Sequence, residues 1–169
     1  MIFALCCLPG HAAAQASSPE SLKAEVIYRL LMFITWPPQK ESPDQRLQLC
    51  TLAEGHVDSA LQSLAGRNIR QLAIAVRRLG RPDQPGDCHV IYLAGPQPML
   101  RAALGDSPVL VVSDAAAMLD EGAMINLQVE DGRIVFDVDL DAARRAGLSI
   151  STKLLRLARY VRHRQGALP

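Results

Sequence analysis

The distribution of apolar residues along the chain begins with a stripe at helical spacing over residues 17–34. The apolar residues of this stripe are Leu22, Val26, Ile27, Leu30, Leu31, Phe33 and Ile34. Either Ser17 or Ser18 can cap the start of such a helix, because a serine hydroxyl accepts from an unpaired amide of the first turn. Pro37 follows the stripe and lacks the amide donor that a continuing helix needs. The pattern therefore predicts one amphipathic helix here.

The middle of the chain alternates between short apolar runs and helical segments. The predicted strands cover residues 47–53, 69–77, 89–94 and 109–112. The predicted helices cover residues 57–64 and 98–104. Strands that are apolar along most of their length, separated by helices, are typical of a parallel sheet that is covered on both faces.

The C-terminal part has a different pattern. Asp131-Gly132, between residues 124–130 and 133–139, predicts a tight β-hairpin. The apolar pairs are then Ile125–Val138, Leu127–Phe136 and Val129–Ile134, and the polar pairs are Asn126–Asp137 and Glu130–Arg133. A helical turn is predicted over residues 141–146 and a final basic amphipathic helix over residues 151–163. We expect a single compact α/β domain, with a mostly parallel sheet flanked by helices on both faces and this hairpin added at one end.

Residues 1–16 have the layout of a secretory signal peptide: an apolar run, a Pro-Gly breaker and small residues at the end. Cleavage could follow Ala14 or Ala16, which leaves one domain over residues 17–169. A buried N-terminal strand is the alternative interpretation. The apolar run is much shorter than the ~20 residues that cross a bilayer. We therefore expect an exported protein that does not span the membrane.

Removal of this segment would leave two cysteines, Cys50 and Cys88. A pair of cysteines in an exported chain favours a disulfide, with two buried thiols as the alternative. A metal site would need two further ligands at short spacing, and only His89 adjoins either cysteine.

The net charge of +1 hides a strong asymmetry. Residues 106–141 contain nine acidic residues and one basic residue, whereas residues 142–169 contain seven basic residues and no acidic one. An exported chain with a net charge close to zero and few aromatic residues does not fit a nucleic-acid-binding protein.

Motifs of enzymes and cofactor sites are missing from the sequence, including glycine-rich phosphate loops and helical metal signatures. Asp114 is the one acidic candidate, because it ends a predicted strand, and Asp137 and Asp139 could join it around a hard cation. The favoured interpretation is that Asp114 caps a helix over residues 115–119 and the other two face solvent. We expect no catalytic, cofactor-binding or metal-binding residues.

The basic C-terminal segment is the main candidate for a binding surface. Lys153, Arg156 and Arg159 recur every three residues, beside the apolar stripe of the predicted final helix. Trp36 and Tyr160 could supply apolar anchors for a protein partner. The alternative is a solvated helix face.

Several stretches of the chain resemble the YfiR family of periplasmic proteins of Gram-negative bacteria. The matching residues are Lys23-Ala24, Tyr28, Phe33, Trp36-Pro37, Cys50, Cys88-His89-Val90, Val112-Ser113-Asp114, residues 122–126, residues 135–139 and residues 142–158. The last of these stretches is the most specific. The resemblance covers about 140 residues of the chain.

This resemblance implies a compact α/β domain without catalysis of its own. It also implies a negative regulator that holds the periplasmic sensor domain of an inner-membrane diguanylate cyclase inactive, which lowers cyclic-di-GMP and biofilm formation. Cys50 and Cys88 match the disulfide positions of the family, whereas the second cysteine pair of better-studied relatives is missing. The sequence leaves open whether the protein forms a homodimer.

Two other functions remain as alternatives. The first is a periplasmic accessory domain that binds a small ligand and reports to a different sensor or transport system. The second, which the residues favour least, is a hydrolase at Ser113-Asp114, where the nucleophile motif of such enzymes is missing.

Overall fold

A computed structural model describes residues 18–40, 46–52, 55–81 and 84–163. The expected signal peptide, residues 1–16, lies outside the described residues. The described helices are α1 (Pro19–Leu31), α2 (Asp58–Gln62), α3 (Pro98–Leu104), α4 (Leu140–Arg145) and α5 (Thr152–Leu155), with a short 3-10 turn, η1, at Pro38–Lys40.

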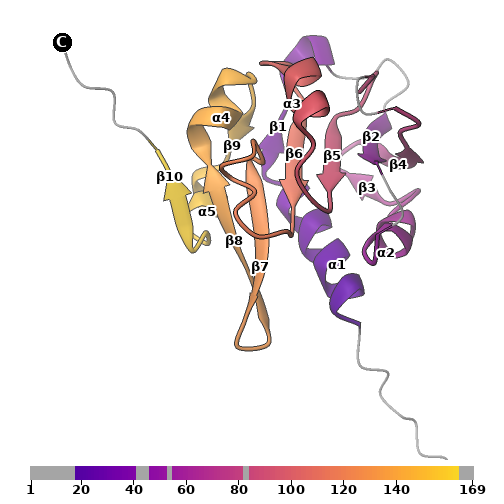
Figure 1. Ribbon diagram of the computed structural model, residues 1–169. Coiled ribbons are helices and arrows are strands. Elements are labelled where there is room, and N and C mark those ends of the chain that lie inside the picture. Colours follow the sequence, from indigo (N-terminus) through magenta and orange to yellow (C-terminus); the bar gives the residue numbers. More distant parts are fainter. Residues whose placement is uncertain (1–17, 41–45, 53–54, 82–83, 164–169) are drawn as a thin grey trace, which may run out of the picture.

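A large mixed sheet forms the centre of the described chain (Figure 1). Its strands are β2 (Arg46–Thr51), β3 (Asn68–Ile69), β4 (Leu72–Arg78), β5 (Val90–Leu93), β6 (Leu110–Ser113), β7 (Ile125–Glu130), β8 (Arg133–Asp139) and β10 (Tyr160–Arg162). Their order is β10-β8-β7-β6-β5-β2-β4-β3, and every neighbouring pair is parallel except β7–β8 and β3–β4. The predicted mostly parallel sheet is therefore confirmed.

The five central strands wind in two directions from β2. The chain passes first to β4 on one side of β2 and then crosses back to β5 on the other side. β6 and β7 then continue outward from β5. This strand order places a topological switch point between the carboxyl ends of β2 and β5, which is where open α/β sheets bind ligands.

Successive residues of the central strands pack on opposite faces of the sheet, as the strand period of two requires. Leu49 and Val90 belong to an apolar layer that also contains residues of α1 and α2. Cys50 and Ile91, their neighbours in the chain, belong to a second layer that contains Leu100 of α3. Helices thus cover both faces, as the sequence predicted (Figure 1).

Helix α1 begins where the sequence predicted and ends earlier. Ser18 caps it, and the Ser18 hydroxyl accepts from the amide of Ser21. The helix ends at Leu31, because the next residues form β1 (Ile34–Thr35), which pairs with β9 (Ser149–Ile150) in a small antiparallel sheet. Leu22, which belongs to the predicted apolar stripe, is 42% exposed.

The predicted strand over residues 69–77 is two strands. β3 and β4 are antiparallel, with Ile69 opposite Leu72. The chain reverses between them, and Arg70 adopts a positive φ of 55° there. A non-glycine residue in this left-handed region is uncommon, and the apolar pattern gave no sign of the turn.

The hairpin formed by β7 and β8 has the predicted register. Ile125 lies opposite Val138, Asn126 opposite Asp137, and Glu130 opposite Arg133. Asp131 and Gly132 have φ values of 49° and 73°, which the tight hairpin turn requires at both central positions. The hairpin does not end the sheet as expected, because β10 lies outside β8.

The predicted basic helix over residues 151–163 is wrong. Helix α5 has only four residues, and the chain then forms β10, which is parallel to β8. Val161 lies beside Val138, whereas Tyr160 and Arg162 lie beside Asp137 and Asp139. Apolar and polar residues therefore alternate along residues 160–162, which is the period of a β-strand. The outer edge of β8 offers unpaired backbone groups, and pairing with that edge outweighs the local helical pattern.

Candidate functional site

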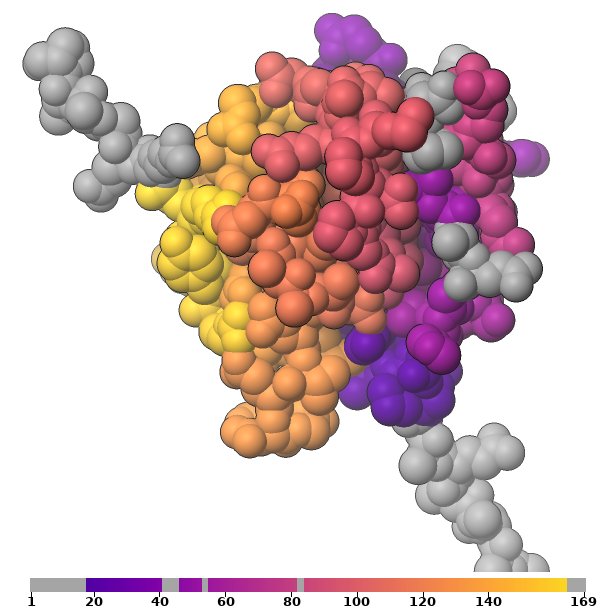
Figure 2. All heavy atoms as spheres, in the orientation of Figure 1, coloured from indigo at the N-terminus to yellow at the C-terminus, as the bar shows by residue number. Residues whose placement is uncertain are grey.

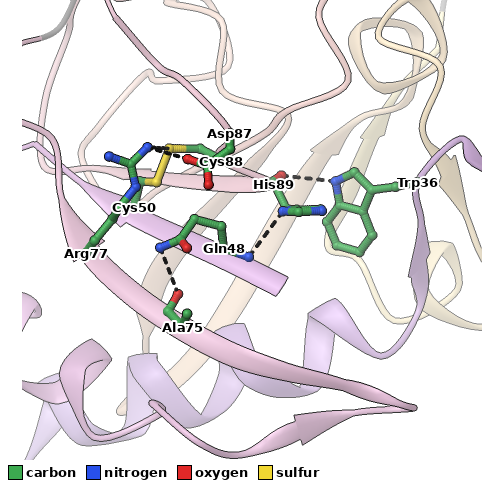
Figure 3. The surroundings of a disulfide bond; sticks show 8 residues. All are labelled: Trp36, Gln48, Cys50, Ala75, Arg77, Asp87, Cys88 and His89. Carbon is green, nitrogen blue, oxygen red and sulfur yellow. Dashed lines mark hydrogen bonds and ion pairs between the residues drawn. A yellow bond between two sulfur atoms is a disulfide. The ribbon is translucent and has the colours of Figure 1, made fainter. Parts of the chain in front are cut away.

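Cys50 and Cys88 form the predicted disulfide (Figure 3). Cys50 lies in β2, Cys88 lies two residues before β5, and their Cα atoms are 6.0 Å apart. Both residues are fully buried. The bond joins β2 to the residues that lead into β5, and these two strands are neighbours in the sheet but are separated by β3 and β4 in the chain.

An arginine lies beside this disulfide (Figure 3). Arg77 Nη2 is 2.6 Å from Asp87 Oδ1 and 3.7 Å from Cys88 Sγ. A Cβ at Gly86, where φ is 60°, would lie 2.8 Å from Arg77 Nη2. The backbone conformation at this position therefore favours glycine, whereas the flexible end of the Arg77 side chain could move away from a Cβ.

His89 follows the disulfide and is buried (Figure 3). Its Nδ1 accepts from the backbone N–H of Gln48 at 3.1 Å, which leaves Nε2 to donate to the carbonyl of Lys40 at 2.7 Å. Burial lowers the pKa of His89 below its ordinary value. The ring is therefore neutral at neutral pH and serves as a fixed link between η1, β2 and β5.

Trp36, a candidate anchor for which a place in the core was the alternative, lies in the core. It is 3% exposed, and its indole Nε1 donates to the carbonyl of His89 at 3.0 Å. Its ring meets the His89 ring edge-on, with centroids 6.0 Å apart. A buried tryptophan needs such a partner for its N–H, so this position is explained by packing and not by an exposed surface.

Asp114 lies at the carboxyl end of β6, where the sequence pointed, but it does not cap a helix. Residues 115–119 form turns, and Asp114 Oδ2 is 2.6 Å from Lys23 Nζ of α1. Asp114 Oδ1 accepts from the hydroxyl of Tyr92 on β5. Burial and then the Asp114 carboxylate raise the pKa of Tyr92 well above its ordinary value, so the phenol stays protonated and donates.

A second carboxylate, which is buried, lies at the same edge of the sheet. Asp58 of α2 accepts from the Thr51 hydroxyl at 2.6 Å and pairs with Arg78 Nη2 at 2.6 Å. Burial disfavours the charge of Asp58, but the hydrogen bonds from Thr51 and Arg78 outweigh burial and hold the pKa of this carboxyl below its usual range. The sequence pattern did not indicate this pair. The available signal was that Thr51 and Arg78 end two strands whose carboxyl ends meet in a parallel sheet.

Asp137 and Asp139 are buried, contrary to the expectation that both face solvent. Arg159 forms ion pairs with Asp137 and Glu130, and its Nε is 2.9 Å from Asp137 Oδ1. Asp139 is within 3.5 Å of Arg162 and also caps α4 through the amide of Ala142. Two arginines of the basic end, Arg159 and Arg162, therefore pair with carboxylates of the acidic middle of the chain.

The rest of the basic segment lies at the surface. Lys153 and Arg156 are exposed and form no ion pair with any described residue. Leu157 and Tyr160 beside them are 69% and 54% exposed. We call these four residues the C-terminal surface. Figure 2 shows the end of the described chain, in yellow, lying against the orange hairpin.

The described residues contain no group of three or more histidine, cysteine, aspartate or glutamate side chains that could hold a metal ion. In the same ranges, no helix combines the length and apolar character needed to cross a membrane.

Comparison with known families gives this arrangement a context. A model of the YfiR/HmsC-like family matches residues 20–159. The chain belongs to this family. Its members are periplasmic regulators without catalytic activity that act on diguanylate cyclase signalling through a membrane sensor. The resemblance that the sequence indicated is thereby confirmed.

Solved structures that are similar to this chain include the following two. A conserved domain protein from Vibrio cholerae is 12% identical with a TM-score of 0.47, and 86% of this chain and 60% of that chain are covered. An ABC domain from Streptococcus pneumonia, in complex with L-Trp, is 10% identical with a TM-score of 0.52, and the match covers 85% of this chain and 60% of that chain. The present chain thus spans three fifths of each protein, and the second similarity concerns the fold alone.

Proposed function

We propose that this protein is exported to the periplasm, binds the periplasmic sensor domain of an inner-membrane diguanylate cyclase, and lowers cyclic-di-GMP and biofilm formation. The observation that carries the proposal is the family match over residues 20–159, which includes most of the described chain. The fold is compatible with it, because the carboxylates of Asp58 and Asp114 at the carboxyl edge of the sheet are held by side chains of the same chain.

The C-terminal surface is the interface that we propose for this partner. It combines two exposed cations, Lys153 and Arg156, with the exposed apolar side chains of Leu157 and Tyr160. Aromatic and basic side chains are frequent energetic centres of protein interfaces, and charge complementarity raises the rate of association with an acidic partner. Trp36 and Arg159 are not part of this proposal, because one is buried and the other pairs with carboxylates of its own chain.

Charge reversal tests this interface. Lys153→Glu combined with Arg156→Glu should leave the fold intact, because both side chains are exposed. The variant should fail to repress the cyclase, so that complemented deletion cells contain as much cyclic-di-GMP and bind as much Congo red as the deletion strain. The measurement is cyclic-di-GMP by mass spectrometry, with the level of exported protein determined in the same cells.

A matched variant controls for total charge. Arg46→Glu combined with Arg145→Glu reverses two other exposed arginines that form no ion pair with described residues, and it should repress like the wild type. Full repression by the Lys153/Arg156 variant would exclude the C-terminal surface. Unchanged cyclic-di-GMP after deletion of the gene would exclude the proposed function itself.

A further inference from the structure

A small apolar pocket lies between α3 and β6. Buried apolar side chains form its floor: Leu93, Leu100, Leu104, Val109, Val111 and Met124. The pocket has a volume of about 50 Å³. Because one water-sized group needs roughly 10–15 Å³ on this measure, there is room for roughly four heavy atoms. A branched aliphatic side chain has this size, whereas an aromatic ring exceeds it.

The solvent-exposed part of the pocket lining is polar. It includes the side chains of Gln97, Arg101, Ser107 and Glu121. Arg101 and Glu121 are the charged residues among them, and neither forms an ion pair with any residue that the structure describes. The opening of the pocket therefore presents one accessible cation and one accessible carboxylate beside an apolar floor.

Arg101 is held in position at this opening. Its Nη1 donates to the carbonyl of Asp120 at 3.2 Å. A Cβ at Gly122, where φ is 100°, would lie 3.3 Å from Arg101 Cδ, so the arginine stem runs along the backbone next to Glu121. A side chain that is already positioned loses less freedom when it binds a ligand. The N–H groups that the Asp120 carbonyl does not use match the oxygens of a carboxylate.

We propose that this pocket binds a free aliphatic α-amino acid. The aliphatic side chain enters the apolar floor, the carboxylate meets Arg101, and the ammonium group meets Glu121. A mainly apolar pocket with a few polar groups at its edge is the usual form of a small-molecule site. This inference goes beyond the proposed repression, and it concerns a different part of the molecule from the C-terminal surface.

The test is a titration of the isolated exported protein, labelled with ¹⁵N, with L-leucine at pH 7 and constant ionic strength. Saturable shifts of the amide resonances should concentrate at Gln97, Arg101, Gly105 and Gly122. Glycine, which lacks the side chain, should bind at least about tenfold more weakly. Isovalerate, which lacks the ammonium group, should bind about threefold more weakly. L-phenylalanine should also bind more weakly than leucine, because its ring exceeds the pocket. The absence of saturation with leucine, or equal affinity for glycine, would overturn the proposal.

Variants assign the binding to the pocket. Val111→Leu adds a carbon to the floor and should weaken leucine binding at least about tenfold, because the added group occupies the space of the ligand. Arg101→Gln should weaken binding about fivefold and Glu121→Gln about threefold, because each removes one charged contact at an exposed position. Arg133→Gln, at an exposed position on β8, should change nothing. Unchanged affinity in the Val111, Arg101 and Glu121 variants would contradict the assignment. Binding is measured without the cyclase, so this result does not depend on repression.

Discussion

His89 lies just before β5, and backbone groups occupy both of its ring nitrogens. Protonation would add an N–H at Nδ1, where the backbone N–H of Gln48 already points. Two donors would then face each other without an acceptor. Burial lowers the pKa of His89, and the hydrogen bond with the carbonyl of Lys40 raises it. The more distant charges oppose each other, because Lys40 lowers this pKa and Asp87 raises it. The net result is a histidine that resists protonation in the folded state.

The stability of the protein should therefore fall in mild acid. Because the pKa of His89 is lower in the folded state than in the unfolded chain, its contribution is complete above about pH 6.5. It is lost as the pH falls from there through the folded-state pKa, at most about 1.4 kcal/mol per pH unit. Urea unfolding at pH 7.5 and pH 5.5 measures the loss. His89→Gln, which can keep both hydrogen bonds without titrating, should show a smaller loss. Equal losses in the two proteins would refute this role.

At the scale of secondary structure elements, β10 is the element that depends most on tertiary contacts. It has three residues, and it pairs with β8 alone. Arg159 and Arg162 connect it to carboxylates of β7, β8 and the loop before β7. Partly exposed ion pairs are individually weak, but here they act on one short edge strand, whose opening costs less than global unfolding.

Removal of these charges should loosen β10 locally. In Arg159→Gln combined with Arg162→Gln, hydrogen exchange across β10, with Val161 at its centre, should become about fivefold faster or more, since this strand is held by pairing with β8. Exchange in β5 and β6 should change much less. Arg145→Gln, at an exposed position on α4, is the matched control. Val161 exchange at the wild-type rate would show that backbone pairing and apolar packing hold the strand without the ion pairs.

At the scale of the whole molecule, the disulfide connects the two strands that flank the switch point. The two cysteines are separated by 38 positions in the sequence. The bond joins β2 to the residues that lead into β5, and β4 lies between these two strands in the chain. In the chain-entropy description, such a bond acts mainly by restricting the unfolded chain.

Loss of this bond should cost a large part of the stability. Cys50→Ala combined with Cys88→Ala should lower the free energy of unfolding by roughly 3–4 kcal/mol, of the roughly 5–15 kcal/mol that a domain has in total. Urea unfolding gives this value. Thiol labelling of the denatured, unreduced wild type should find neither cysteine free. Two labelled cysteines, or a loss below about 1 kcal/mol, would contradict the prediction.

The sequence by itself determined much of the sheet. Continuous runs of apolar residues indicated a parallel sheet that is covered on both faces, because such a sheet buries both sides of its strands. Asp131-Gly132 and the alternation beside it determined the hairpin register, since a shift by one residue would turn every apolar side chain outward. Asp114 was found because it ends an apolar strand. Each of these signals is local in the chain.

Only the tertiary structure decided which secondary structure the C-terminal segment adopts and which charged side chains pair at the carboxyl edge of the sheet. The apolar spacing of residues 151–163 fits a helix as well as a short helix followed by a strand, and the free edge of β8 selected the second. Likewise, Lys23 meets Asp114 across 91 positions of sequence, and Arg78 meets Asp58 only because β2 and β4 are neighbours. Charge pairing and strand pairing depend on distances in space, which the order of residues does not contain until the chain has folded.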